Sequence, residues 1–160
     1  MSAATPELGF SDGRLLTFEV LETVYALPIS QVLEVTERGR TTCVPKLERS
    51  CAGVMNWHGE ALPVLSPILL LLPDEQATVS GEKSDLEREH VLVISDRPDG
   101  AARMGLPIDR VLGLVSAEAT RGAKGELVIE RRSIDGRVVS VLDPRRLVSR
   151  GAEVIQRAVA

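Results

Sequence analysis

The chain repeats itself, and this repeat constrains the fold more than any other feature of the sequence. The segment "LPISQVLEV" at 27–35 matches "LPIDRVLGL" at 106–114, an offset of 79 residues. The segment "HGEALPVLSP" at 58–67 matches "DGRVVSVLDP" at 135–144, an offset of 77 residues. Two matches in the same order at nearly equal offsets indicate that the chain contains two structurally similar halves.

Both halves carry the pattern of short β-strands. From Arg14 onward, short runs rich in Val, Leu and Ile alternate with Gly, Pro and charged residues, which is typical of a sandwich or barrel. We therefore expect a mainly all-β protein in which each half holds two hairpins. The second hairpin is predicted to turn at Gly59-Glu60 in the first half and at Asp135-Gly136 in the second.

The expected organisation is a single domain at 14–148 between two short terminal segments. It comprises a first barrel at about 14–72, a charged connecting loop at about 73–89 and a second barrel at about 90–148. Residues 1–13 are expected to form a flexible arm, and the apolar spacing of the tail at 149–160 is compatible with a helix. Halves of this size are marginal alone, so we expect them to share one hydrophobic core.

Composition excludes several classes of function. The formal net charge of −4 argues against a nucleic-acid-binding protein, whose affinity depends on a basic face. The longest apolar run, at 68–72, is far shorter than the roughly 20 residues of a membrane-spanning helix. The N-terminal residues lack the pattern of a secretory signal, and two cysteines make no disulfide framework. The sequence therefore predicts a cytoplasmic protein without membrane insertion.

The sequence provides no combination of residues that would support catalysis or metal binding. His58 and His90 are the only histidines, and no nucleophile elbow, Walker loop or His-Glu-x-x-His helix occurs. Cys43, Cys51 and His58 have a spacing unlike that of structural zinc sites, and free cysteines commonly behave as small buried apolar residues. We assign no catalytic residue, metal or cofactor.

Two features near the centre of the chain have more than one interpretation. Strand alternation places Asn56 and His58 on one face, and Met55 and Trp57 on the opposite, core-facing side. The first face is either solvated or a partner surface. The apolar run "PILLLLP" at 67–73 is either a buried turn that closes the first barrel or an exposed patch at an interface.

Four blocks together resemble the CheW family of bacterial chemotaxis coupling proteins. These blocks are "YALPISQVLEV", "GVMNWHGEALPVLSP", "ARMGLPIDRVLGLVSAE" and "SIDGRVVSVLDPRRLV", in the order and spacing of the family. The resemblance covers about residues 14–148. It implies a fold of two SH3-like, five-stranded β-barrel subdomains that share a hydrophobic core, with short helices.

The resemblance also implies a non-enzymatic adaptor. Family members couple the cytoplasmic tip of a methyl-accepting chemoreceptor, held in the groove between barrels, to the regulatory domain of a CheA-like histidine kinase, within receptor arrays. The kinase contacts the ends of the first barrel. By position, the partner-binding residues correspond to Val32, Glu34, Asn56, His58 and Gly59.

The chain departs from the family pattern in the half that meets the kinase. His58 stands where the family usually has Arg, Ser66 stands where Asp is usual, and "PILLLL" replaces a charged turn. Because His is mostly uncharged near neutral pH whereas Arg is always charged, a pair between Glu34 and a cation is expected to be weakened or lost.

Two other functions therefore remain open. The first is an accessory CheW-like protein that binds receptors or a paralogous CheW-like protein without standard kinase binding, as in a Frizzy-type gliding-motility pathway. The second belongs to another class, a small ligand-binding or hydrolytic β-barrel, which the lack of convergent polar groups disfavours.

Overall fold

The computed structural model describes residues 13–37, 41–42, 51–71, 88–116 and 126–159. Most of the expected N-terminal arm and connecting loop lies outside these residues.

The structure is mainly β, as expected. In the first half the elements are β1 (Arg14–Val20), β2 (Thr23–Pro28), the 3-10 turn η1 (Ile29–Gln31), β3 (Val32–Glu37), β4 (Thr41–Thr42), β5 (Cys51–Trp57), β6 (Glu60–Leu65) and α1 (Pro67–Leu71). In the second half they are β7 (His90–Ile94), β8 (Met104–Ile108), β9 (Arg110–Ser116), β10 (Val128–Ile134), β11 (Arg137–Leu142) and α2 (Pro144–Val159).

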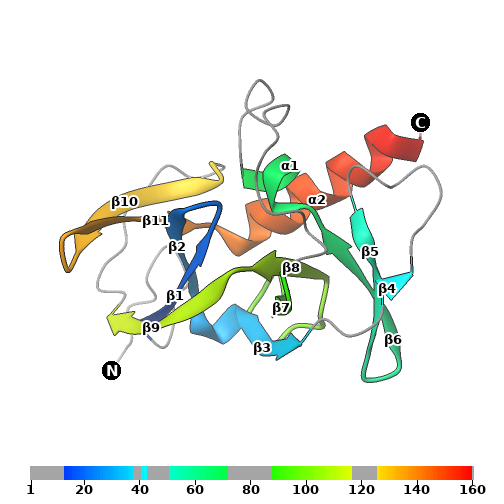
Figure 1. The fold of residues 1–160 in the computed structure, drawn as a ribbon, viewed down its shortest axis with the longest axis horizontal. Helices are drawn as coiled ribbons and strands as arrows, with labels where there is room; N and C mark the ends of the chain where they lie inside the picture. The colour runs from blue at the N-terminus through cyan, green and yellow to red at the C-terminus, as the bar shows by residue number, and fades with distance from the viewer. Residues whose placement is uncertain (1–12, 38–40, 43–50, 72–87, 117–125, 160) are drawn as a thin grey trace, which may run out of the picture.

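Each of the two sheets takes strands from both halves of the repeat (Figure 1). One sheet has the order β10-β11-β2-β1-β9, and the other has the order β3-β7-β8-β6-β5-β4. The third strand of each half pairs with the first strand of the other half, since β9 pairs with β1 and β3 pairs with β7. The sequence ranges expected for the two barrels, 14–72 and 90–148, therefore do not coincide with the two sheets.

Hydrogen bonds at two crossing points hold the exchanged strands in place. After β2 the chain makes η1 and reaches the end of β7, where the Ser95 N–H donates to the Gln31 carbonyl at 3.0 Å. Gln31 Nε2 donates back to the Ser95 carbonyl at 3.4 Å. After β8, the Asp109 N–H donates to the Glu19 carbonyl of β1 at 2.9 Å. Both Leu-Pro-Ile motifs therefore mark the points where the chain passes from one sheet to the other.

A mainly aliphatic core cluster joins the two sheets. Its fully buried members include Phe18 and Leu27 from the first half, and Leu92, Leu106 and Leu142 from the second. Each such side chain contributes about 1.5–3 kcal/mol when it leaves water. The core therefore holds the halves together as one folding unit, as the small size of each half led us to expect.

The two helices begin in the same way and pack against each other (Figure 1). Pro67 and Pro144 occupy the first helical position, where a missing N–H leaves no hydrogen bond unmade. The Asp143 side chain accepts a hydrogen bond from the Arg145 N–H at 3.0 Å and caps α2. Helix α2 continues to Val159, so most of the expected C-terminal tail is helical. None of the helices among the described residues combines the length and apolar character that crossing a bilayer requires.

The apolar run at 67–72 is largely a packing element. Pro67 and Leu70 are buried, and Ile68, Leu69 and Leu71 are half-buried. Arg150 of α2 donates from Nε to the Leu70 carbonyl at 3.0 Å and from a terminal nitrogen to the Leu69 carbonyl at 3.3 Å. These bonds satisfy carbonyls at the end of α1, which lack partners within so short a helix. Leu72 lies outside the described residues.

Gly105 permits the close approach of β7 and β8 in the core. A Cβ atom at this position would lie 2.7 Å from Val91 Cγ1. We predict that Gly105→Ala lowers the free energy of unfolding by about 1–3 kcal/mol through overpacking, measured by chemical denaturation. Combining it with Val91→Ala should relieve the clash, so the loss in the double variant should be smaller than the sum of the single losses. Strictly additive losses would contradict this explanation.

The link from α2 to α1 predicts a second stability effect. Arg150→Met retains the aliphatic stem but removes the donors to the α1 carbonyls, and it should lower the free energy of unfolding by about 1–3 kcal/mol. Arg145, which is exposed on the same helix, provides the control. We expect Arg145→Met to change the same quantity by no more than about 0.5 kcal/mol. Equal effects of the two substitutions would show that the hydrogen bonds to α1 do not stabilise the fold.

Candidate partner-binding site

Strand β3 brings Glu34 to the rim of its sheet. This strand is an edge strand of its sheet and pairs with β7. The register of that pairing shifts between Val32 and Glu34. Along β3, half-buried and exposed residues alternate, and the Glu34 side chain is 39% exposed. Glu34 therefore lies in a strand that places its carboxylate near the β5–β6 hairpin.

Two donors from the β5–β6 hairpin meet the same oxygen of Glu34. Trp57 Nε1 donates to Glu34 Oε1 at 2.8 Å, and His58 Nε2 lies 3.1 Å from that oxygen. The two rings contact each other edge to face, with centroids 4.6 Å apart. Glu34, Trp57 and His58 therefore form a compact polar cluster, which we call the Glu34 cluster. Sequence reasoning assigned Trp57 to the core alone and missed that its N–H group reaches outward.

The backbone conformation of the hairpin turn explains why the ring of His58 contacts the ring of Trp57. His58 and Gly59 both have positive φ, at 51° and 86°, and Trp57 is aligned with Glu60 across the hairpin. The turn is therefore His58-Gly59 in a type I′ arrangement, which corrects the predicted turn at Gly59-Glu60. Strand alternation ends at Trp57, so His58 does not share the face of Asn56. The turn at Asp135-Gly136 is confirmed by the positive φ values of both residues.

The Glu34 cluster keeps the carboxylate ionised. Hydrogen bonds from His58 first, and from Trp57 second, lower the pKa of Glu34 below its ordinary value. We expected the pair between Glu34 and a cation to be weakened or lost, and the structure keeps the two side chains within hydrogen-bonding distance at 3.1 Å. Position 58 differs from the arginine that is usual in the family in one respect: a histidine is positively charged only when it is protonated.

The remaining predicted residues have structural roles. Asn56 Oδ1 accepts a hydrogen bond from the Gly59 N–H at 2.8 Å and thereby closes the turn. Gly59 occupies a left-handed conformation that glycine adopts without strain. Val32 is half-buried and packs against the shared core. The structure thus brings Glu34 and His58 together, and pairs Asn56 with Gly59, whereas Val32 contributes to the packing of the core.

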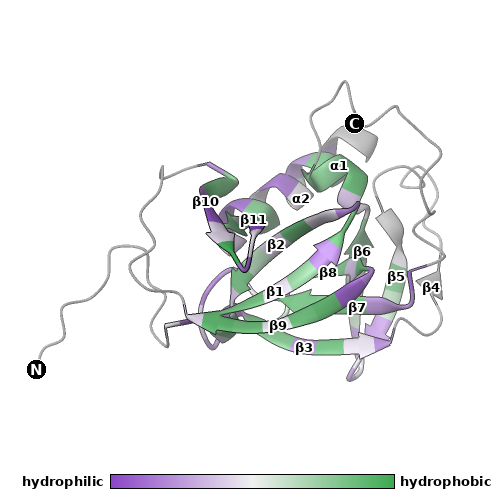
Figure 2. Ribbon diagram, turned by 60° about the vertical axis from the view of Figure 1, so that its left-hand side comes forward, coloured by the Kyte–Doolittle hydropathy of each residue, from purple (hydrophilic) through white to green (hydrophobic). Residues whose placement is uncertain are grey.

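A second surface, which sequence reasoning did not identify, is apolar. Strands β3 and β9 each end a sheet and run along the same side of the molecule (Figures 1 and 2). We call their exposed apolar residues the β3–β9 strip; these are 38–50% exposed and comprise Leu33, Val35, Val111, Leu112 and Leu114. Leu33 and Val35 occupy the same repeat positions as Leu112 and Leu114. The sequence did carry a signal for this surface, namely the apolar block that is repeated as "VLEV" at 32–35 and "VLGL" at 111–114. Apolar side chains on the edge strands of a sheet can stay exposed.

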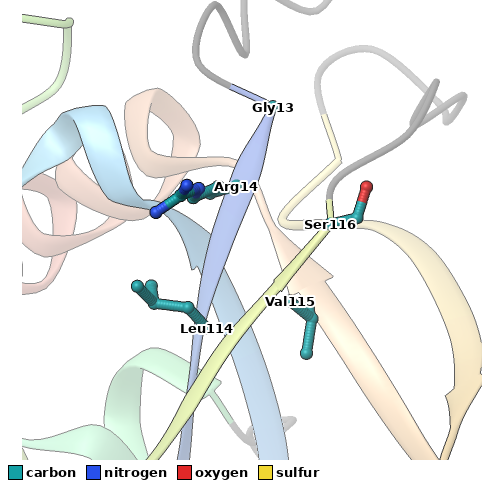
Figure 3. Close-up of a pocket in the computed structure, with 5 residues that line it drawn as sticks. All are labelled: Gly13, Arg14, Leu114, Val115 and Ser116. Atoms are coloured by element: carbon teal, nitrogen blue, oxygen red, sulfur yellow. The ribbon is translucent and has the colours of Figure 1, made fainter.

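The hollow beside the β3–β9 strip carries no catalytic constellation. It is lined by Gly13, Arg14, Leu114, Val115 and Ser116, where the start of β1 meets the end of β9 (Figure 3). The lining provides one guanidinium and one hydroxyl, without a base to activate the hydroxyl. Within the described residues, no group of three or more His, Cys, Asp or Glu side chains is placed to hold a metal ion. Cys43, part of the Cys43, Cys51 and His58 set, lies outside them.

Comparison with known proteins agrees with this architecture. Residues 14–152 match the model of the CheW-like domain family. The chain is 24% identical over 144 residues to the chemotaxis protein CheW of Thermotoga maritima, covering 84% of this chain and 86% of that protein. Its fold matches the scaffolding protein TtCheW of Thermoanaerobacter tengcongensis with a TM-score of 0.65 at 18% identity, covering 84% and 91% of the two chains. The chain therefore belongs to the CheW-like domain family.

Proposed function

We propose that this protein couples a methyl-accepting chemoreceptor to a histidine kinase by binding them at two different surfaces. The observation that supports this proposal is the arrangement of β3. Along this strand Leu33 and Val35 belong to the β3–β9 strip, whereas the intervening Glu34 belongs to the Glu34 cluster. Successive side chains of a strand point to opposite faces, so one edge strand serves two surfaces.

The β3–β9 strip is the surface proposed for the receptor tip. Its residues lie on the outermost strands of both sheets, where a helical receptor tip can pack between the two sheet edges. Exposed aliphatic side chains gathered on one side of a protein mark an interaction surface. Burial of one such side chain contributes up to about 1.5–3 kcal/mol, so several of them supply a useful part of the affinity.

The Glu34 cluster is the surface proposed for the regulatory domain of the kinase or for a paralogous CheW-like protein. It combines an ionised carboxylate, an indole and an exposed imidazole at the end of one sheet. Charged groups at the rim of an interface chiefly set specificity and association rate. Receptor arrays in the cytoplasm are the setting that this pairing of partners implies.

An accessory protein that binds receptors without standard kinase coupling is the second candidate. The observation that favours it is His58, since a histidine gives the cluster no permanent cation. Ser66, a second departure from the family pattern, is buried and immediately precedes α1, where its carbonyl accepts a hydrogen bond from the Leu70 N–H, so it does not alter the exposed surface. The difference between the two candidates therefore depends on residue 58.

The β3–β9 strip provides a test of receptor binding. We predict that Leu112→Ser combined with Leu114→Ser weakens binding of a receptor signalling tip at least roughly tenfold, measured by calorimetry, because apolar contact is lost. Val138→Ser is the matched control, since Val138 is 62% exposed on β11 and lies outside the strip. Binding of the kinase regulatory domain should be unchanged in both variants. An unaltered receptor affinity in the double variant would contradict the assignment of the strip.

Residue 58 provides a test of kinase binding. At pH 7.5, near which histidine is mostly neutral, His58→Arg should raise affinity for the kinase regulatory domain roughly two- to fivefold because it supplies a permanent cation. Pull-down and calorimetry with the purified domain measure this effect, and receptor binding should not change. If neither the receptor tip nor the kinase domain binds the wild-type chain, the adaptor proposal is wrong. If only the kinase domain fails to bind, and His58→Arg does not restore binding, His58 is not the cause of the lost coupling.

A further inference from the structure

The contact between Glu34 and His58 determines which ring nitrogen carries the proton. An ionised carboxylate can only accept hydrogen bonds, so His58 Nε2, at 3.1 Å from Glu34 Oε1, carries a hydrogen in the neutral ring. Trp57 donates to the same oxygen and helps to fix the carboxylate. The other ring nitrogen, Nδ1, is then a bare acceptor in a side chain that is 68% exposed.

We propose that His58 is a proton-operated switch in the partner surface, which turns from an acceptor at Nδ1 into a charged donor as the pH falls. Protonation adds a hydrogen to Nδ1 while Nε2 stays on Glu34. The fitting partner group is a carboxylate of the bound protein, because only an acceptor gains from a new N–H donor and its positive charge. The choice of a carboxylate as the partner group rests on the proposed function. The change of His58 on protonation is a property of this chain alone.

The surrounding charges strengthen the contrast between the two states. Glu34 is the charged side chain that contacts His58. Glu60, at the start of β6, follows His58 closely in the chain, whereas Glu37 lies on the opposite face of β3 from Glu34. His90 on β7 is aligned with Glu37 in the strand pairing and therefore belongs to that opposite face of the sheet. With His58 neutral, this surface repels a carboxylate. With His58 protonated, one negative charge is compensated and a donor becomes available.

The sign of the pH dependence follows from the two groups in contact. The hydrogen bonds from His58 and Trp57 lower the pKa of Glu34, so Glu34 stays ionised over the mildly acidic range in which imidazole side chains in general take up a proton. Acidification over this range therefore charges the imidazole and leaves the carboxylate charged. Binding of an acidic partner group must strengthen as the pH falls.

The protonation states can be measured on the chain alone. Two-bond ¹H–¹⁵N correlation spectra of the full chain, recorded from about pH 5.5 to about pH 8, report the tautomer of each histidine. We expect the neutral His58 ring to carry its hydrogen on Nε2 and to gain a second one on Nδ1 in acid. The His90→Gln variant leaves a single histidine and so assigns the signals. A neutral ring with its hydrogen on Nδ1 would overturn the proposal.

Partner binding provides the second arm of the test. Between about pH 8 and about pH 5.5, affinity of the wild-type chain for the kinase regulatory domain should rise roughly two- to fivefold. The His58→Arg variant should bind with the higher affinity at every pH. The His58→Asn variant, whose asparagine tolerates the left-handed backbone, should bind with the lower affinity at every pH. His58→Asn also reveals any titration of the partner itself.

The outcomes of the two arms are distinct. An equal rise in the His58→Asn variant, or no rise in the wild type, would refute the switch. Absence of binding by every variant at every pH would contradict the proposed function instead, and the tautomer measurement would then decide the switch alone.

Discussion

The exchange of edge strands between the two halves is the constraint on which the rest of the structure depends. Because β3 pairs with β7 and β9 pairs with β1, neither half can complete its sheet without the other. The hydrogen bonds of Gln31 with Ser95, and of Asp109 with Glu19, fasten both crossings. The shared core follows from this arrangement, since each sheet buries residues of both halves against the other sheet.

The same exchange positions the candidate surfaces. It moves the third strand of each half to the end of the opposite sheet, where one side of the strand stays uncovered. The two edge strands carry the same apolar block of the repeat, with exposed side chains at related positions. Both strands run along one side of the molecule (Figure 2). Exposed strand edges usually carry a risk of aggregation. Here the apolar residues on them are the proposed site for a partner.

The two halves have diverged where the Glu34 cluster lies. The repeat position of Glu34 is occupied by Gly113, and that of His58 by Asp135. The second half therefore keeps the type I′ turn but lacks the carboxylate, the indole and the imidazole that meet in the first half. A symmetric fold thus presents an asymmetric surface, which is the property that an adaptor with two different partners requires. The hydrogen bonds within the cluster also hold the side chains in place before any partner binds.

The sequence by itself determined the repeat, the mainly β fold, the shared aliphatic core and the turn at Asp135-Gly136, because these depend on local periodicity and on turn chemistry. It also singled out Glu34 and His58 through the family resemblance. Only the tertiary structure decided which copy of a repeated strand pairs with which sheet, since equivalent strands offer similar edges. It also decided that Trp57 donates to Glu34, because a contact between residues 23 positions apart depends on how β3 and β5 are placed in space.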